Sequence, residues 1–411
     1  MNSLTTLDVD FVRHQFPDFG DWAFFENAGG TFVPHIVIDR VRTYMTETQV
    51  QPGAAYKASA LAAERIARSQ QVMAEFINAT SDEIIIGPSS TMNVYVLSRA
   101  LQSWFKSGDE LIVTNLDHET NIGAWRRLAD PGIVIKEWQI NPETAELEVE
   151  QLEELLTERT KLVCFTYCSN ITGSIHDVQA ITRLVHDAGA LACVDAVAYA
   201  PHRSLDVKAL DVDFCFFSTY KVYGPHLSIL YGKREHLLNA QGQNHFFFGE
   251  RDIPLKLNPG GVNHELTSAL AGVVDYFDAL HGHHRSDGGA DLHRRVRAVY
   301  ELVAEHEQTL ANRFLDFMHS KSDVRLVGRK TGDKQWRAPT FSFAVANRNS
   351  EEFPPRLAEH RIAIGAGNFY AARCIDALGL APQSGVVRVS MVHYNTLDEV
   401  DRLIEHLSQV L

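Results

Sequence analysis

The sequence predicts an α/β protein, in which a mostly parallel sheet is sandwiched by helices and a smaller carboxyl-terminal α+β domain follows. From about Glu83 onward, short apolar runs alternate with segments of helical period. This alternation is typical of a parallel sheet with helices on both faces. The chain is also 411 residues long, which is more than one compact core of ordinary size needs, so a large and a small domain are expected.

Seven apolar runs are predicted to be the strands of the large sheet. They lie at 83–87, 109–115, 133–140, 161–168, 190–195, 212–218 and 227–232. Amphipathic stretches between them, such as 90–104 and 179–189, have apolar residues three and four apart, as helices do. A sheet of this kind places its active site at the carboxyl ends of the strands.

The carboxyl-terminal part contains strands and helices of its own. Apolar runs at 324–328, 339–345 and 386–392 predict strands, and the segments 297–318 and 398–410 predict helices. A polar, glycine-containing stretch near His281 to Asp291 predicts a linker between the domains. We expect three parts: residues 1–30, which join the small domain, the large domain at 31–285, and the small domain at 286–411.

The composition argues against several classes of protein. The net charge of -14 would repel nucleic acid and anionic lipid, and no apolar stretch approaches the ~20 residues of a membrane-spanning helix. The amino terminus has no basic segment followed by an apolar run, so no secretion signal is expected. Five cysteines without a CxxC pair, three of them inside apolar strand-like runs, indicate small core residues in a reducing compartment. We expect a cytoplasmic protein that binds neither nucleic acid nor membrane.

Lys221 stands where two apolar runs meet, in the segment FCFFSTYKVYGPHLSILYG (214–232). Burial disfavours the ammonium form and lowers the pKa of a lysine. A lysine that is partly neutral is a nucleophile toward carbonyl groups. On position alone, a strand-end lysine with its head in water is the commoner arrangement.

Three other segments place polar side chains after apolar runs. Asp195 could keep the pyridine nitrogen of a cofactor such as pyridoxal 5'-phosphate (PLP) protonated, although an isolated aspartate is more often a cap. Ser89, Ser90 and Thr91 precede a predicted helix, where amide and hydroxyl groups suit a phosphate but also cap ordinary helices. His118 could stack on a cofactor ring, although a lone histidine is otherwise a surface loop residue.

Taken together, the motifs resemble the class V aminotransferase family of fold type I PLP enzymes. The matching segments are ENAGG (26–30), DHETNIGAW (117–125), SNITGSIHDV (169–178), VDAVAYAPH (194–202), FSTYKVYGPH (217–226) and VVRVSMVHYNTLDEVDRL (386–403). They occur in order from about residue 23 to the carboxyl terminus, and the nearest branch is similar to the cysteine desulfurases and selenocysteine lyases. The ordered set is far more specific than any single motif.

The resemblance implies a role for each matching residue. Lys221 matches the lysine that carries PLP, and Arg388 matches the arginine that binds the substrate carboxylate, a bidentate contact for which a guanidinium is suited. The cofactor-binding residues that it implies are Ser89, Ser90, His118, Asn170, Asp195, Ser218, Lys221, Gly261 and Asn263. Ala28, Asn170 and Arg388 would bind the substrate. The segment NPGGVNHE (258–265) falls where a neighbouring subunit completes the phosphate site, which implies a homodimer.

The chain departs from the desulfurase pattern in the loop that supplies the catalytic cysteine. The aligned stretch GAGNFY (365–370) places Tyr370 where that cysteine would be and Gly365 where an arginine would be. Cys374 follows in a helical pattern, where cysteines are usually buried and inert. Tyr220 stands in place of a histidine and Ala198 in place of a glutamine. These changes predict a desulfurase-like subgroup that does not transfer sulfur through an enzyme cysteine.

The predicted activity is cleavage at the β carbon of an amino-acid-like substrate, because the nearest relatives share this step. The expected catalytic residues are Lys221, His118, Tyr370 and Tyr220. Lys221 would take the α proton and later return it, and Tyr370 or Tyr220 could serve as the acid for the leaving group. An aminotransferase or epimerase on the same scaffold stays open, as does a non-catalytic PLP-binding sensor or partner subunit.

No metal site is expected. The histidines at positions 281, 283 and 284 form the one cluster that could indicate a metal. They fall in the predicted linker, where a solvated loop is the simpler interpretation.

Overall fold

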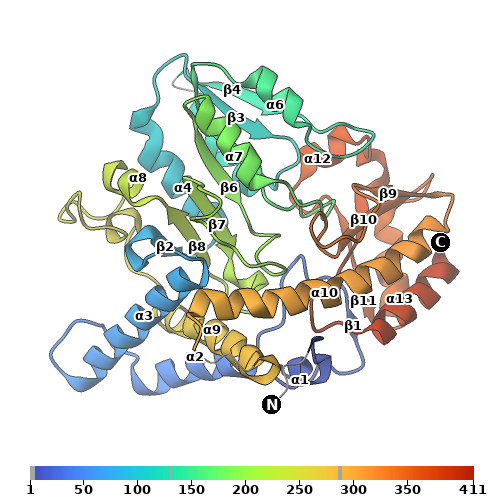
Figure 1. Ribbon diagram of the computed structural model, residues 1–411, viewed down its shortest axis with the longest axis horizontal. Coiled ribbons are helices and arrows are strands. Elements are labelled where there is room, and N and C mark those ends of the chain that lie inside the picture. The colour runs from blue at the N-terminus through green and yellow to red at the C-terminus, as the bar shows by residue number, and fades with distance from the viewer. Residues whose placement is uncertain (1–4, 130–131, 286–288) are drawn as a thin grey trace.

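The computed structural model describes residues 5–129, 132–285 and 289–411. A seven-stranded sheet forms the centre of its larger part, in the order β2-β8-β7-β6-β5-β3-β4 (Figure 1). The strands are β2 (Ile84–Gly87), β3 (Glu110–Thr114), β4 (Val134–Trp138), β5 (Thr160–Thr166), β6 (Leu191–Asp195), β7 (Phe214–Ser218) and β8 (Ser228–Gly232). All neighbours from β7 to β4 run parallel, whereas β8 is antiparallel to β2 and to β7. The predicted fold class is confirmed, and each predicted run coincides with one strand to within a few residues.

The central strands are almost wholly apolar because helices cover both faces of the sheet. In β7, Cys215 and Phe217 belong to one buried core, while Phe214 and Phe216 belong to the other. This alternation follows from the two-residue period of a strand. The helices of this part are α2 (His35–Glu47), α3 (Lys57–Phe76), α4 (Ser90–Leu101), α5 (Gly123–Arg126), α6 (Val149–Leu155), α7 (Val178–Asp187), α8 (Arg234–Asn239) and α9 (His264–His284).

A second, antiparallel sheet with the order β12-β13-β10-β9 lies in the carboxyl-terminal part. Its strands are β9 (Val324–Val327), β10 (Thr340–Val345), β12 (Gly365–Gly367) and β13 (Val386–Ser390). The helices here are α10 (Leu292–His319), α11 (Phe353–Ala358), α12 (Ala372–Ala377) and α13 (Leu397–Val410). Figure 1 shows the long α10 running from the neighbourhood of α9 to this second sheet.

The amino-terminal segment lies against the carboxyl-terminal part. Its short strand β1 (Ala23–Phe24) pairs in parallel with β11 (Ile362–Ala363), and the side-chain amide of Asn27 donates to the carbonyl of Ser390 at 2.9 Å. The division at residues 30 and 285 stays a proposal, and the second boundary adjoins 286–288, which lie outside the described residues.

The three clustered histidines do not lie in a linker, so this expectation is wrong. His281, His283 and His284 form the last turn of α9. The short helix α1 (Val9–Arg13) packs there: the backbone amide of Asp8 donates to Nε2 of His284 at 2.8 Å, and the ring of Phe11 stacks on His283 with centroids 3.7 Å apart. These contacts extend the helix beyond the point where the composition predicted its end. In the described ranges, no group of three potential ligand side chains could hold a metal ion.

Within the described part of the chain, every helix is either too short or too polar to cross a membrane.

Candidate active site

A cavity of about 470 Å³ lies at the carboxyl ends of β5, β6 and β7. The last residue of each of these strands, namely Thr166, Asp195 and Ser218, contributes to its wall. Because these strands are parallel, their ends meet at one edge of the sheet, which is where an α/β sheet carries its site.

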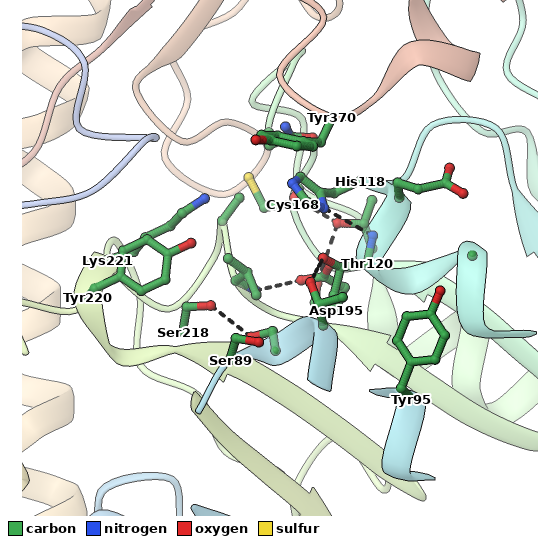
Figure 2. Close-up of a pocket in the computed structure, with 18 residues that line it drawn as sticks. Ser89, Tyr95, His118, Thr120, Cys168, Asp195, Ser218, Tyr220, Lys221 and Tyr370 are labelled. Atoms are coloured by element: carbon green, nitrogen blue, oxygen red, sulfur yellow. Dashed lines mark hydrogen bonds between the residues drawn. The ribbon is translucent and has the colours of Figure 1, made fainter. Parts of the chain in front are cut away.

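The structure brings most of the predicted site residues together around this cavity. Figure 2 shows Lys221, His118 and Asp195 around one space, with Ser89 and Ser218 on one side of it and Tyr370 on the opposite side. The predicted residues in the wall are Ser89, Ser90, His118, Asn170, Asp195, Ser218, Tyr220, Lys221 and Tyr370. The wall also contains Tyr95, Glu119, Thr120 and Cys168, which the sequence did not single out.

Four predicted residues lie outside the wall of this cavity. Gly261 and Asn263 line a different cavity, beside Met92. The amide of Ala28 donates to Oγ of Ser390 at 2.8 Å. Arg388 is the fourth. Within one chain, the structure therefore does not bring these residues into the wall formed by Lys221 and Asp195.

Lys221 is buried, which decides between the two interpretations of its position. It ends the 3₁₀ turn Thr219–Lys221 that follows β7, and Oγ1 of Thr219 fixes this turn by donating to the carbonyl of Pro225 at 2.6 Å. Only 7% of Lys221 is exposed. Burial and the neighbouring Arg388 guanidinium lower the pKa of Lys221 to about 8, although the Asp195 and Glu26 carboxylates oppose them. Among the described residues its ammonium has no hydrogen-bond partner, so the amine is available to a ligand.

Asp195 ends β6 and is 4% exposed. One of its oxygens, Oδ1, accepts the backbone amide of Val197 at 2.8 Å, so the residue does cap a turn, as the simpler interpretation held. Its other oxygen has no hydrogen-bond partner in the described part of the chain. Burial raises the pKa of Asp195 to about 6. A carboxylate with one open oxygen can accept a proton-bearing nitrogen of a ligand.

The amino terminus of α4 and the serines beside it form the floor of the cavity. Ser89 is the N-cap of α4, and its side chain accepts the amide of Met92. Oγ of Ser90 lies 2.7 Å from Oγ of Ser218 and 2.9 Å from Oγ of Ser228. Helix amides carry partial positive charge and hydroxyls can reorient their protons, so this floor suits a phosphate group.

His118 presents a neutral ring. Its Nδ1 accepts the backbone amide of Thr120 at 3.1 Å, so the proton of the neutral ring is on Nε2. Burial, with the charges of Lys221 and Arg388, lowers the pKa of His118 to about 3. A neutral aromatic ring can stack on a flat cofactor without adding charge.

Asp117 fixes the loop that carries His118. It is buried, and its carboxylate accepts hydrogen bonds from the side chains of Thr114 and of Asn121, the latter at 2.8 Å. Burial raises the pKa of Asp117 to about 7. Its role had no separate signal in the sequence beyond its place in the DHETN motif.

The loop that ends in Tyr370 is fastened to the large part of the molecule. The carbonyl of Tyr370 accepts the amide of Glu119 at 2.7 Å, and the side-chain amide of Asn170 donates to the carbonyl of Phe369 at 3.0 Å. Phe369 and Tyr370 have φ of 48° and 59°, in the left-handed region that costs side chains strain. Tyr370 is 73% exposed, and its ring centroid lies 5.3 Å from that of His118.

Neither cysteine near the site is an accessible thiol. Cys374 is fully buried in α12, and burial raises its pKa to about 12. Cys168 contributes to the cavity wall but is 1% exposed, and burial raises its pKa to about 12 as well. The expectation of a buried, helical Cys374 is confirmed.

Arg388 is held between three neighbours. It donates through Nη1 to the carbonyl of Asn170 at 3.2 Å and through Nη2 to Oε1 of Glu26 at 2.6 Å. The ring of Phe369 covers its face, with the centroid 3.6 Å from Cζ. The ion pair with Glu26 was not predicted, because no sequence pattern relates two residues so far apart in the chain.

These groups fit pyridoxal 5'-phosphate. A buried amine lies at one side of the cavity, and a carboxylate with an open oxygen, a neutral imidazole and a hydroxyl-lined helix terminus share its wall. A carbonyl, a pyridine nitrogen, an aromatic ring and a phosphate are the matching groups of that cofactor.

Comparisons with known proteins agree with this fit. The Aminotransferase class-V family model matches residues 23–286 and 289–403. The chain is 38% identical over 418 residues to the aminotransferase-like protein FGM3 of Gibberella zeae, with both chains covered completely. It is 33% identical over 421 residues to the cysteine desulfurase-like protein ustD of Aspergillus flavus, which covers 98% of this chain and 91% of that protein.

Solved structures share the fold. The apo cysteine desulfurase of Thermococcus onnurineus NA1 superimposes with a TM-score of 0.86 at 22% identity, covering 100% of this chain and 99% of that one. The cysteine desulfurase CsdA of Escherichia coli gives a TM-score of 0.82 at 23% identity and covers 98% of both chains. With its cavity, its lysine and a family model matched over nearly its whole length, the chain belongs to the class-V aminotransferase family and is a PLP-dependent enzyme.

Proposed function

We propose that the protein is a lyase that breaks a bond at the β carbon of an amino-acid-like substrate and forms no persulfide on the enzyme. The observation that carries this proposal is the side chain at the mouth of the cavity. Tyr370, which is 73% exposed, stands where the sequence pattern of the desulfurases has a cysteine. A phenol can donate a proton, but it cannot accept a sulfur atom as a persulfide.

The residues of the cavity would hold PLP as follows. Ser89, Ser90 and Ser218 would bind the phosphate, Asp195 the pyridine nitrogen, and Lys221 the carbonyl carbon, while His118 would cover the ring. When bound, PLP supplies an electron sink for negative charge at the α carbon of the substrate. The open oxygen of Asp195 would maintain that sink by keeping the pyridine nitrogen protonated.

The substrate would be bound by Arg388 and Asn170 and would exchange protons with Lys221. A lysine with a pKa of about 8 is poised to take a proton from carbon and to return it. Tyr370 or Tyr220 would protonate the leaving group. Both tyrosines share the cavity wall with Lys221, and Nζ of Lys221 lies 5.9 Å from the Tyr220 ring centroid.

We also propose that the enzyme works as a homodimer with shared active sites. Two apolar surfaces support this. A groove of about 710 Å³ along α2 is lined almost entirely by apolar groups and includes Ile38 and Met45, which are 43% and 55% exposed. Phe246 and Phe247, in the loop before Gly261, are 98% and 66% exposed. In a dimer, Gly261 and Asn263 would complete the phosphate site of the partner subunit.

A cytoplasmic location is part of the proposal. Its support is that all five cysteines are free and buried, as thiols of a reducing compartment are.

The test is to incubate the purified enzyme with a panel of amino acids. The experiment follows the absorbance of bound PLP together with the release of ammonia, keto acid and sulfide. A β-lyase should release ammonia and a keto acid without an amino acceptor. Turnover that requires an added keto acid would favour an aminotransferase, racemised product would favour an epimerase, and no turnover would favour a sensor or partner subunit.

A further inference from the structure

The guanidinium of Arg388 has one donor that its own chain does not use. The residue is 3% exposed, and among the described residues its Nε is buried without a hydrogen-bond partner. A buried N–H without an acceptor costs stability, so such a donor indicates a missing ligand. The two Nη atoms are engaged, by the carbonyl of Asn170 and by Glu26.

The free donor and the one that binds Glu26 belong to the same edge of the guanidinium. Nε and Nη2 lie side by side in the planar fork, and a carboxylate that approaches this edge can bind both with its two oxygens. Glu26 uses only Oε1, at 2.6 Å from Nη2, and leaves Nε empty. Glu26 therefore forms one of the two hydrogen bonds that a carboxylate can form with this edge.

The Nε–Nη2 edge of Arg388 can be reached where Glu26 now lies. The ring of Phe369 covers one face of the guanidinium at 3.6 Å, and the carbonyl of Asn170 occupies another donor. The Glu26 side chain, which binds Nη2 at this edge, is 29% exposed. A ligand from solvent thus reaches the Nε–Nη2 edge by taking the place of Glu26.

Two glycines leave the space that the Glu26 carboxylate fills. A Cβ atom at Gly29 would lie 2.2 Å from Oε2 of Glu26, and one at Gly365 would lie 2.7 Å from Oε1. Since the carboxylate is the far end of a flexible side chain, such a Cβ would displace it, and at Gly365 it would also lie 2.9 Å from the ring of Phe369. The present position of the Glu26 carboxylate thus requires that both positions lack a Cβ atom.

We propose that Glu26 is an internal competitor for the substrate carboxylate and thereby sets the affinity and selectivity of the site. A substrate carboxylate binds both Nε and Nη2 and displaces Glu26 toward solvent. A ligand that binds through one atom only replaces the contact that Glu26 already makes and gains little. This inference rests on the proposed role of Arg388 in substrate binding.

The test compares L-alanine with L-alaninamide, which lacks the carboxylate. Each is titrated into the PLP-loaded enzyme, and the dissociation constant is taken from the change in the absorbance of bound PLP. In Glu26→Gln the shape is retained and the charge is lost, so alanine should bind about tenfold more tightly, while alaninamide should change by less than about twofold. Glu301→Gln, which removes a carboxylate of a surface ion pair on α10, should leave both constants unchanged.

The charge of Glu26 also acts on Lys221, so its loss in Glu26→Gln affects any amine that reacts with the cofactor. The alaninamide titration measures that effect separately from carboxylate binding. Weaker alanine binding in Glu26→Gln, or binding within about twofold of the native value, would overturn the inference. Arg388→Gln separates the two proposals. If it binds alanine as tightly as the native enzyme, Arg388 is not the carboxylate site; if it loses alanine binding while Glu26→Gln shows no gain, only the role of Glu26 is wrong.

Discussion

The buried ammonium group of Lys221 should lower the free energy of unfolding by a measurable amount. Its pKa falls from 10.5 to about 8 on burial, and each pKa unit corresponds to 1.36 kcal/mol. Below pH 8 the lysine is charged in both the folded and the unfolded chain, so the folded state carries the full penalty. Between pH 8 and 10.5 only the unfolded lysine stays protonated, so the stability of the folded state rises with pH.

We therefore expect Lys221→Met to raise the free energy of unfolding of the PLP-free protein by about 3 kcal/mol below pH 8. The gain should shrink as the pH rises toward 10.5. Urea unfolding of both proteins at pH 6.5 and pH 9.5 measures it, and an equal gain at both values would contradict a buried ammonium. The variant should also lose turnover and covalent attachment of PLP.

Loss of the Asp195 carboxylate should slow the reaction at the α carbon but should not prevent attachment of PLP to Lys221. Asp195→Ala leaves Lys221 in place, so borohydride should still fix PLP onto Lys221. Exchange of the substrate's α deuterium should slow by on the order of a thousandfold, because the pyridine nitrogen loses its counter-charge. Asp316→Ala, at an exposed position of α10, is the matched control. Near-native exchange in Asp195→Ala would show that another group holds the nitrogen.

At the scale of single elements, we predict that helix α12 holds Cys374 away from the reaction. Its Cys374 is buried with a raised pKa, so Cys374→Ser should keep native turnover. A buried hydroxyl in place of the thiol should lower stability by about 1 kcal/mol, which thermal unfolding would detect. Mass spectrometry after incubation with cysteine, with and without reductant, should find no persulfide on either protein. Fast sulfide release that disappears in Cys374→Ser would mean that sulfur transfer survives with a displaced nucleophile.

The elements also show where sequence reasoning succeeds. All seven strands of the large sheet were predictable, because each lies in an apolar run, and all except the edge strand β4 are almost wholly buried. The strands β1, β11 and β12 were not, since the first two have two residues each and β12 is Gly-Ala-Gly, which is too small to form an apolar pattern. The end of α9 was missed because α1, a distant segment, supplies contacts there.

For the molecule as a whole, we expect association through α2. Native protein should sediment as a dimer of the 46.0 kDa chain, and the double variant Ile38→Glu, Met45→Glu should sediment as a monomer, because two charges would enter an apolar interface. Val149→Glu, at a 39% exposed position of α6, should remain dimeric. The monomer should bind PLP more weakly if Gly261 and Asn263 serve the partner subunit. A monomeric variant with native PLP affinity would argue against shared sites.

The site as a whole was predictable to the extent that strand ends and motifs report it. Lys221, Asp195 and Ser218 follow apolar runs, and parallel topology brings them together. The pairing of Glu26 with Arg388 depends on how the amino-terminal segment lies against β13, and no local pattern encodes that contact. The neutral state of His118 likewise results from burial, which one segment alone cannot reveal.

The glycines beside Glu26 restrict which substitutions the contact with Arg388 tolerates. A Cβ atom at position 29 or 365 would lie within 2.7 Å of an oxygen of the Glu26 carboxylate in its present place. A Gly365→Ala exchange would place a methyl group 2.7 Å from the Glu26 carboxylate and 2.9 Å from the Phe369 ring, so it would disturb two contacts of Arg388 at once. A single exchange at a glycine could thus change the surroundings of the guanidinium without altering any charged residue.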